Sequence, residues 1–211
     1  WCGFEPETGE RLWASEIRFQ HSTMPVWRHG DKHYVVGGSA GKIRCVDVAA
    51  GKTEWTIDRR VLSHGRGYGC GGISVYKDYL LGYLQIGEDR KNYTKHAAAW
   101  KLSEDGPEKL WEHPVPESNA EHVPVIVNER YVFLGDLKVV QLESGKVVAQ
   151  GEGVKPGNGG YMQAMGDLAL VRRDGTHGDI QFTFYRVAND GSVTNLNPEN
   201  QWRPTYGAGT T

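Results

Sequence analysis

The sequence is poor in cysteine, and its three cysteines, Cys2, Cys45 and Cys70, lie far apart with no Cys-x-x-Cys pair. This spacing excludes the common zinc and dithiol motifs. Buried thiols are therefore expected, with one disulfide left open. No run of 18 apolar residues is present, so no transmembrane helix is expected. The formal net charge of −2 gives no reason to expect nucleic acid or an anionic membrane as a partner.

Catalytic signatures are missing as well. The chain has no Ser-His-Asp order and no paired-carboxylate motif. Gly67, Gly69 and Gly72 match the pattern G-x-G-x-x-G, but we predict a strand over 73–76, where a dinucleotide-binding loop requires a helix. The chain does not begin with Met and shows no signal peptide, so the sequence itself indicates no compartment.

Glycine, by contrast, is abundant, with 28 of 211 residues, or about 13 % against an average of about 7 %. Five apolar stretches each run into a tight turn at a glycine, and these are Gly9, Gly51, Gly106, Gly145 and Gly191. The intervals between them are 42, 55, 39 and 46 residues. A period of roughly 40 to 45 residues is typical of a β-propeller. The longest interval contains a polar run, 87–96, which we predict as a long hairpin loop.

The residues between the glycine turns predict four short antiparallel strands in each repeat, and no amphipathic helix is evident. In the clearest repeat the strands are expected at 22–27, 33–37, 43–48 and 53–57. We therefore predict an all-β propeller fold of four-stranded blades, or a large section of one. The expected organisation is a partial blade at 3–17, blades at about 20–60, 70–115, 120–153 and 158–197, and a partial blade at 202–211.

The two partial blades allow two interpretations. The chain is either a piece of a longer propeller, or its ends pair to close the ring with a fifth blade. We favour the piece, because the combined end segments lack one strand and an open ring leaves unprotected sheet edges, which natural proteins avoid.

The repeat resembles that of the pyrroloquinoline-quinone-like propellers, the superfamily of quinoprotein dehydrogenases and outer-membrane-assembly lipoproteins. The segment 46–55, Val-Asp-Val-Ala-Ala-Gly-Lys-Thr-Glu-Trp, follows the family pattern nearly throughout, and 8–13 follows its second half. The resemblance covers about residues 3–197. It implies that Trp13, Trp55 and Trp111 dock between adjacent blades, where large flat side chains bury much area. Val148 or Ala149 and Thr194 stand near the equivalent place in the two weaker copies, whose joints should be looser.

The resemblance also bears on function, because the superfamily contains enzymes and non-enzymes. It implies a periplasmic, cell-envelope or secreted location in bacteria. Pyrroloquinoline quinone with calcium is a cofactor possible only by this resemblance, and the adjacent cysteines of the quinone-dependent dehydrogenases are absent. The sequence therefore favours a non-catalytic binding or scaffold module with a protein or polymer partner. The alternative is a quinoprotein-type alcohol or sugar dehydrogenase, or a degenerate relative of one.

Histidines form the most distinctive polar set. His21, His64 and His122 each lie just before or at the expected first strand of a repeat, and Arg66 lies beside His64. First strands line the central channel of a propeller, so these side chains are candidates for a metal or anion site at the channel mouth. The alternative is that each histidine was inherited with the repeat and makes a local backbone hydrogen bond, while Arg66 is a solvated loop charge.

Overall fold

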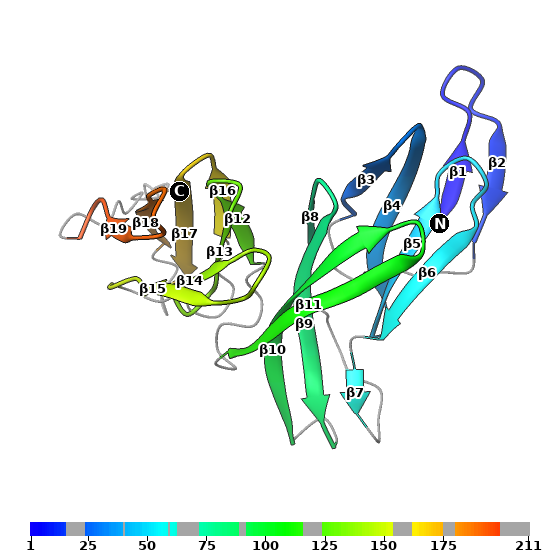
Figure 1. Ribbon diagram of the computed structural model, residues 1–211. Helices are drawn as coiled ribbons and strands as arrows, with labels where there is room; N and C mark the ends of the chain where they lie inside the picture. The colour runs from blue at the N-terminus through cyan, green and yellow to red at the C-terminus, as the bar shows by residue number, and fades with distance from the viewer. Residues whose placement is uncertain are drawn as a thin grey trace, which may run out of the picture. The chain divides into compact units, whose positions relative to one another are not determined.

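The computed structural model describes residues 1–15, 24–39, 41–58, 60–62, 72–88, 92–115, 124–153, 162–174 and 180–198. All regular elements in these ranges are β-strands, which confirms the all-β prediction. No helix in the described ranges is long and apolar enough to cross a membrane. The chain divides into two compact units, unit 1 (Trp1–Pro114) and unit 2 (Val115–Thr211), which are described separately below (Figure 1).

Unit 1 begins with a two-stranded sheet, sheet A, followed by a four-stranded one, sheet B. Sheet A consists of β1 (Cys2–Phe4) and β2 (Arg11–Ala14). Sheet B has the order β3-β4-β5-β6, with β3 at Val26–His29, β4 at Lys32–Ser39, β5 at Lys42–Asp47 and β6 at Thr53–Asp58. All neighbouring strands in both sheets are antiparallel.

Sheet C completes unit 1 and departs from the expected four strands. Its path is β11-β10-β9-β7, and β8 also pairs with β9. Its strands are β7 (Arg60–Leu62), β8 (Ser74–Tyr76), β9 (Tyr79–Gly87), β10 (Tyr93–Ser103) and β11 (Gly106–Val115). The short β8 covers only the first part of β9, and β7 pairs in parallel with its last part.

The loop predicted over 87–96 is wrong in its second half. Tyr93 pairs with Gly87 and His96 pairs with Leu84, so 93–96 belong to β10. The extra residues of this repeat lengthen the two central strands instead of forming a long loop. Polar residues are tolerated in these extensions because a strand places every second side chain toward solvent.

Unit 2 contains two four-stranded antiparallel sheets, as predicted. Sheet D consists of β12 (Val125–Val127), β13 (Tyr131–Phe133), β14 (Lys138–Gln141) and β15 (Val147–Gln150). Sheet E consists of β16 (Met162–Met165), β17 (Leu168–Asp174), β18 (Ile180–Val187) and β19 (Val193–Asn195). The partial blade expected at 202–211 lies outside the described residues.

Each unit has its own hydrophobic core. In unit 1 the core lies between sheets B and C and includes Trp27, Ile43, Leu80 and Trp100. In unit 2 it lies between sheets D and E and includes Phe133, Val139, Val171 and Tyr185. Pairs of sheets that face each other across apolar side chains are the packing that a repeat of this kind provides.

The turn at the repeat glycine is the same in three copies. In the second copy the Asp47 amide donates to the Lys52 carbonyl, and the Gly51 amide donates to the Asp47 carbonyl. Glu5 with Gly9, and Gln141 with Gly145, repeat this pattern. The three glycines have φ values of 69°, 67° and 68°, in the left-handed region that glycine adopts most readily.

The other two glycine turns are shorter. Gly106 follows a connection of two residues between β10 and β11 and has a φ of 113°. The turn at Gly191, which has a φ of 86°, is one residue shorter than the turns at Gly9, Gly51 and Gly145. The three longer turns are each accompanied by a register shift in the paired strands, between Gly3 and Phe4, Cys45 and Val46, and Val139 and Val140. The equivalent residues of these three copies can therefore be assigned by pairing as well as by sequence.

Candidate functional site

The predicted channel-mouth residues, His21, His64, Arg66 and His122, lie outside the described residues, and their convergence stays a prediction. Among the described residues, no group of three or more His, Cys, Asp and Glu side chains is close enough to hold a metal ion. The site that the structure describes lies elsewhere, around the hairpin of β1 and β2.

Trp13 joins this hairpin to sheet B. Its indole Nε1 donates to the Val48 carbonyl at 2.8 Å. The ring lies so close to two glycines, its cross-strand partner Gly3 and the turn residue Gly51, that a Cβ at either position would collide with it. Trp13 therefore packs between its own sheet and the glycine turn of the next one.

Trp55 occupies the same register position in sheet B, opposite Cys45 instead of Gly3. It packs against the core between sheets B and C, but its buried Nε1 has no hydrogen-bond partner among the described residues. The turn glycine of the next copy, Gly106, has open space where a Cβ would stand. The two-residue turn of sheet C thus does not offer Trp55 the contact that the longer turn offers Trp13. Trp111 is buried, with its ring 5.5 Å from that of His113.

Unit 2 makes the corresponding joint with a residue that the sequence analysis missed. The turn at Gly191 is packed by Val148, whose Cγ2 lies 2.8 Å from the position of a Cβ, and by Tyr131. The Tyr131 hydroxyl donates to the Asn189 carbonyl at 2.9 Å. Tyr131 thus supplies the ring and the hydrogen bond, although it lies on β13 and not on the strand after the glycine turn. Repeat alignment alone gave no signal for it.

A cleft of about 660 Å³ lies between sheet A and the adjacent part of sheet B. Its apolar lining includes all three residues of β1, Leu12 of β2 and Val35 of β4. Met24, which precedes β3, and Val48, which follows β5, also line it. Phe4, Leu12 and Met24 are each more than half exposed. Polar groups at the cleft come from Asp31, Lys32, His33 and Asp47.

Local contacts hold Asp47 at the cleft and the carboxyl groups at the nearby hairpin tip. Asp47 Oδ1 accepts hydrogen bonds from the Ala49 and Ala50 amides at 2.8 and 2.9 Å, so it orders the turn. At the tip of the β1–β2 hairpin a hydrogen bond between two exposed carboxyl groups raises the pKa of Glu5 and lowers the pKa of Glu7. The cleft is therefore mainly an apolar surface with a mixed polar margin.

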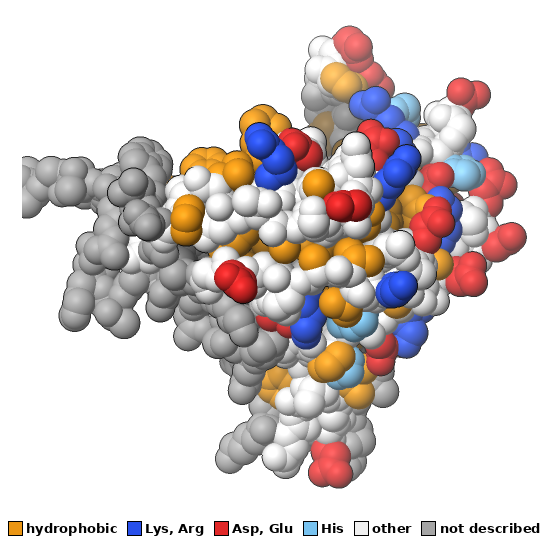
Figure 2. All heavy atoms as spheres, turned by 60° about the vertical axis from the view of Figure 1, so that its left-hand side comes forward, with side chains coloured by type: hydrophobic (Ala, Val, Ile, Leu, Met, Phe, Trp, Pro, Cys, Tyr) orange, Lys and Arg blue, Asp and Glu red, His pale blue; other side chains and the backbone are white. Residues whose placement is uncertain are grey.

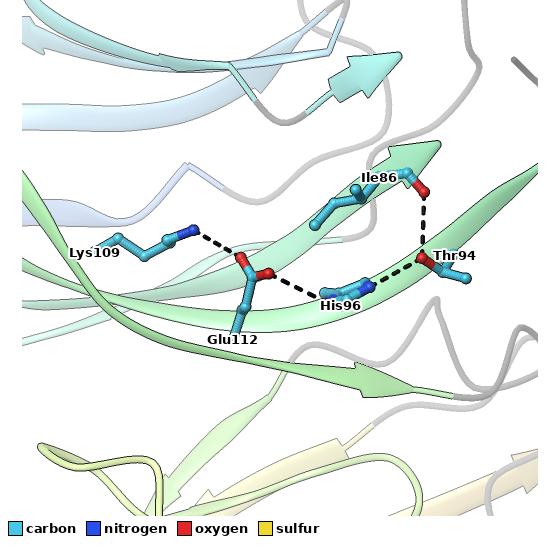
Figure 3. A network of polar contacts seen from close by, with 5 residues as sticks. All are labelled: Ile86, Thr94, His96, Lys109 and Glu112. Atoms are coloured by element: carbon cyan, nitrogen blue, oxygen red, sulfur yellow. Dashed lines mark hydrogen bonds and ion pairs between the residues drawn. The ribbon is translucent and has the colours of Figure 1, made fainter. Parts of the chain in front are cut away.

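A second polar cluster lies on sheet C (Figure 3). The Thr94 hydroxyl lies 2.9 Å from His96 Nε2 and 3.2 Å from the Ile86 carbonyl. Glu112 Oε1 lies 3.7 Å from His96 Nδ1, and its other oxygen accepts a 2.8 Å bond from Lys109. A hydroxyl, an imidazole and a carboxylate stand in the order used by nucleophilic triads.

The geometry of this cluster favours a structural role. The distance from His96 Nδ1 to Glu112 exceeds that of a hydrogen bond, and the carboxylate is already held by Lys109. The Thr94 hydroxyl has the Ile86 carbonyl as an acceptor, and the cluster does not line the cleft. We interpret it as a cross-strand link between β10 and β11.

The surface carries charges of both signs. On the face shown in Figure 2, Lys and Arg side chains alternate with Asp and Glu side chains, and hydrophobic side chains are exposed between them. This mixture is consistent with the small formal net charge of −2.

The chain belongs to the family described as outer membrane protein assembly factor BamB, whose profile matches residues 3–202. This places it among the pyrroloquinoline-quinone-like repeat proteins, as the repeat pattern indicated. No curated protein matches the chain.

Three solved structures are similar to it. They are the GH43 protein BlXynB of Bacillus licheniformis (15% identity, TM-score 0.39), a putative 6-phosphogluconolactonase of Bacteroides fragilis (10%, 0.42) and a eukaryotic initiation factor (12%, 0.42). The matches cover 84%, 92% and 92% of this chain. The chain spans 42%, 75% and 51% of the length of these structures.

Proposed function

We propose that this chain is a non-catalytic binding or scaffold module of the bacterial cell envelope that docks a protein partner. The observation that carries the proposal is the apolar cleft beside β1, with Phe4, Leu12 and Met24 exposed around it. Exposed apolar surface of this kind, rimmed by polar residues, marks interaction sites in soluble proteins. Membership of a family described as an outer membrane protein assembly factor supports the envelope location and a protein as partner.

Site-specific photo-cross-linking tests this proposal. We would place a photoreactive phenylalanine analogue at Leu12 in the cleft and, as the control, at Met165, a still more exposed apolar position on β16. Irradiation in a bacterial envelope fraction is expected to give a discrete protein adduct from position 12 and none from position 165. No adduct from position 12, or the same adducts from both, would overturn the proposal.

The competing function is a quinoprotein-type oxidoreductase. A second experiment distinguishes it from the binding module. Tryptophan fluorescence of the folded chain would be titrated with pyrroloquinoline quinone and calcium. Seven tryptophans are available as reporters. The proposal predicts a flat titration. Saturable quenching that is lost without calcium, followed by dye reduction with an alcohol or sugar, would contradict it.

A further inference from the structure

His96 lies at the centre of the polar cluster on sheet C, between Thr94 on its own strand and Glu112 on the neighbouring one (Figure 3). We propose that this cluster is a pH-sensitive link between β10 and β11. Neutral His96 leaves the link open, and protonated His96 closes it with a hydrogen bond from Nδ1 to Glu112. The proposal goes beyond the binding function and does not rest on it, because none of these three residues lines the cleft.

The hydrogen bonds of Thr94 determine which nitrogen of neutral His96 carries the proton. A hydroxyl group has one hydrogen, and that of Thr94 donates to the Ile86 carbonyl at 3.2 Å. The 2.9 Å contact between the Thr94 oxygen and His96 Nε2 is therefore a bond that Nε2 donates. Neutral His96 is thus the Nε2–H tautomer, and its Nδ1 carries only a lone pair.

This lone pair stands in an unfavourable place. His96 Nδ1 is buried and has no hydrogen-bond partner among the described residues. It faces Glu112 Oε1 at 3.7 Å, and an ionised carboxylate can only accept a hydrogen bond. Two acceptors therefore oppose each other across a gap longer than a hydrogen bond. A buried acceptor without a donor costs free energy, and a proton on Nδ1 removes this cost.

Protonation turns the contact into an attractive one. The imidazolium donates from both nitrogens, from Nε2 to Thr94 and from Nδ1 to Glu112. Hydrogen bonds between charged groups are shorter and about twice as strong as those between neutral groups. Histidine side chains take up a proton over a pH range of about 8 to 5, so the link closes as the medium becomes acidic.

The other charged groups near the histidine do not compete for this role. Lys109 holds the second oxygen of Glu112 at 2.8 Å, so the first oxygen stays directed at His96. Lys95 and His113 follow or precede these residues directly in β10 and β11. Because successive side chains of a strand point to opposite faces, both belong to the other face of the sheet.

The neighbouring strands contribute apolar residues to this face. On β9 the residues beside the cluster are Leu84 and Ile86, and on β7 Val61 pairs with Ile86. From sheet B the side chain of Ile43 reaches the face at Gly82. The charge that responds to protonation of the histidine is therefore that of the glutamate on β11.

The position of the link gives it a conformational consequence. The cluster lies on the lengthened part of β10, beyond the segment of β9 that pairs with β8. Strand β11 is at the end of the sheet order and is joined to this part through β10 alone among the described strands. Closing the link at acidic pH therefore fastens the end strand to the lengthened part of sheet C.

NMR spectroscopy of the full chain tests the protonation states. In ¹⁵N-labelled protein, long-range ¹H–¹⁵N spectra distinguish the two neutral tautomers of each histidine. At pH 8 we expect His96 to be the Nε2–H tautomer. An Nδ1–H tautomer at this pH would overturn the proposal, because Glu112 would then have its donor without protonation. This measurement uses the unmodified chain and is decisive even where a variant fails to fold.

A double-mutant cycle measures the strength of the link in urea at about pH 5.5 and pH 8. The variants are His96→Leu, Glu112→Gln and the combination of both. The unfolding equilibrium constants should show a coupling of about fivefold or more at the lower pH and less than about twofold at the higher. Equal coupling at the two pH values would overturn the proposal in favour of a link that is insensitive to pH.

The control for this cycle is His33, an exposed histidine on β4. His33→Leu combined with Glu112→Gln should show no coupling at either pH, because the two residues lie on different sheets. The same pH-dependent coupling for His33 as for His96 would overturn the proposal, since the effect would then not depend on the contact between His96 and Glu112.

Discussion

The first and second copies of the repeat form the same hairpin in different surroundings. Both have the long glycine turn, the register shift and a tryptophan at the same position. In the second copy β5 is covered by β4, and its turn glycine, Gly51, is covered by Trp13. In the first copy β1 has an open edge among the described residues, and Gly9 has open space around it.

The local sequence determines the hairpin, while the neighbouring strands determine which of its side chains are exposed. The same motif is a core element in one copy and is largely exposed, within the described residues, in the other. The predictions below test how far the two copies differ, beginning with the largest effect.

The first prediction compares the cysteines of the two strands. The expectation of buried thiols is confirmed for Cys45 on β5, which is buried, and is wrong for Cys2 on β1, which is exposed. Burial raises the pKa of Cys45 from 9.0 to about 12, with smaller contributions from Glu54 and Asp47. At pH 8 alkylation of Cys45 should be about a thousandfold slower in the folded than in the unfolded chain, because only the thiolate reacts. Peptide mass mapping after brief iodoacetamide treatment measures this, and Cys2 should be labelled first.

The raised pKa of Cys45 also makes the stability of the folded chain depend on pH. A thiol whose pKa is raised by folding stabilises the folded state fully below pH 9, and this contribution is lost as the pH rises from 9 toward 12. Rapid labelling of Cys45 in the folded chain at pH 8 would contradict the buried position of β5.

The second prediction compares the two turn glycines. Gly9 and Gly51 both have positive φ, which an alanine adopts only with strain. Gly9→Ala should therefore lower the free energy of unfolding by about 1 kcal/mol. Gly51→Ala should lower the free energy of unfolding by about 3 kcal/mol, because the added Cβ also collides with the Trp13 ring. Urea denaturation of both variants checks this difference. Equal costs would show that Trp13 does not hold the turn of the next sheet.

The third prediction compares the two equivalent strand residues. Val46→Ala should destabilise the chain by about 2 kcal/mol, because it leaves a cavity at a fully buried position beside Val35 of β4. Phe4→Ala should change stability by no more than about 0.5 kcal/mol, since the ring is exposed. Thermal unfolding of the two variants provides the measurement. A large loss of stability from Phe4→Ala would mean that the ring already belongs to a core.

The fourth prediction compares the joints of the two units. Trp13→Phe removes the hydrogen bond to Val48, and Tyr131→Phe removes the one to Asn189. Tyr131→Phe should lower the free energy of unfolding in urea by about 1 kcal/mol, the usual contribution of one such bond. Trp13→Phe should lower it by about 2 kcal/mol, because it also removes part of the ring that packs against Gly3 and Gly51. A neutral Tyr131→Phe variant would break the equivalence between the tryptophan joint of unit 1 and the tyrosine joint of unit 2.

Much of the fold could be predicted from the sequence because its signals are local. Positive φ at a glycine, alternation of apolar residues and the period of the repeat depend on a few neighbouring residues. The strands of sheet B lie within a few residues of the predicted ones. The loop predicted over 87–96 failed in part because strand length depends on pairing with β9, which the polar composition of the run does not indicate.

The candidate site was not predictable in the same way. The exposure of Phe4 depends on which strand lies beside β1, and the sequence of the hairpin does not indicate that neighbour. Tyr131 was missed because its role depends on contact with a turn about sixty residues later. The histidines singled out from the sequence stay a prediction, as they lie outside the described residues.

A double-mutant cycle between Trp13 and Gly51 measures the difference between the two copies most directly. Urea denaturation would be followed for Trp13→Ala, Gly51→Ala and the double variant, and for Gly9→Ala alone and with Trp13→Ala as the control pair. We expect a coupling free energy of about 1 kcal/mol or more between Trp13 and Gly51, whose added Cβ would collide with the indole ring, and none between Trp13 and Gly9, which has open space. Equal coupling of the two pairs would contradict the packing of Trp13 on the turn of the next sheet.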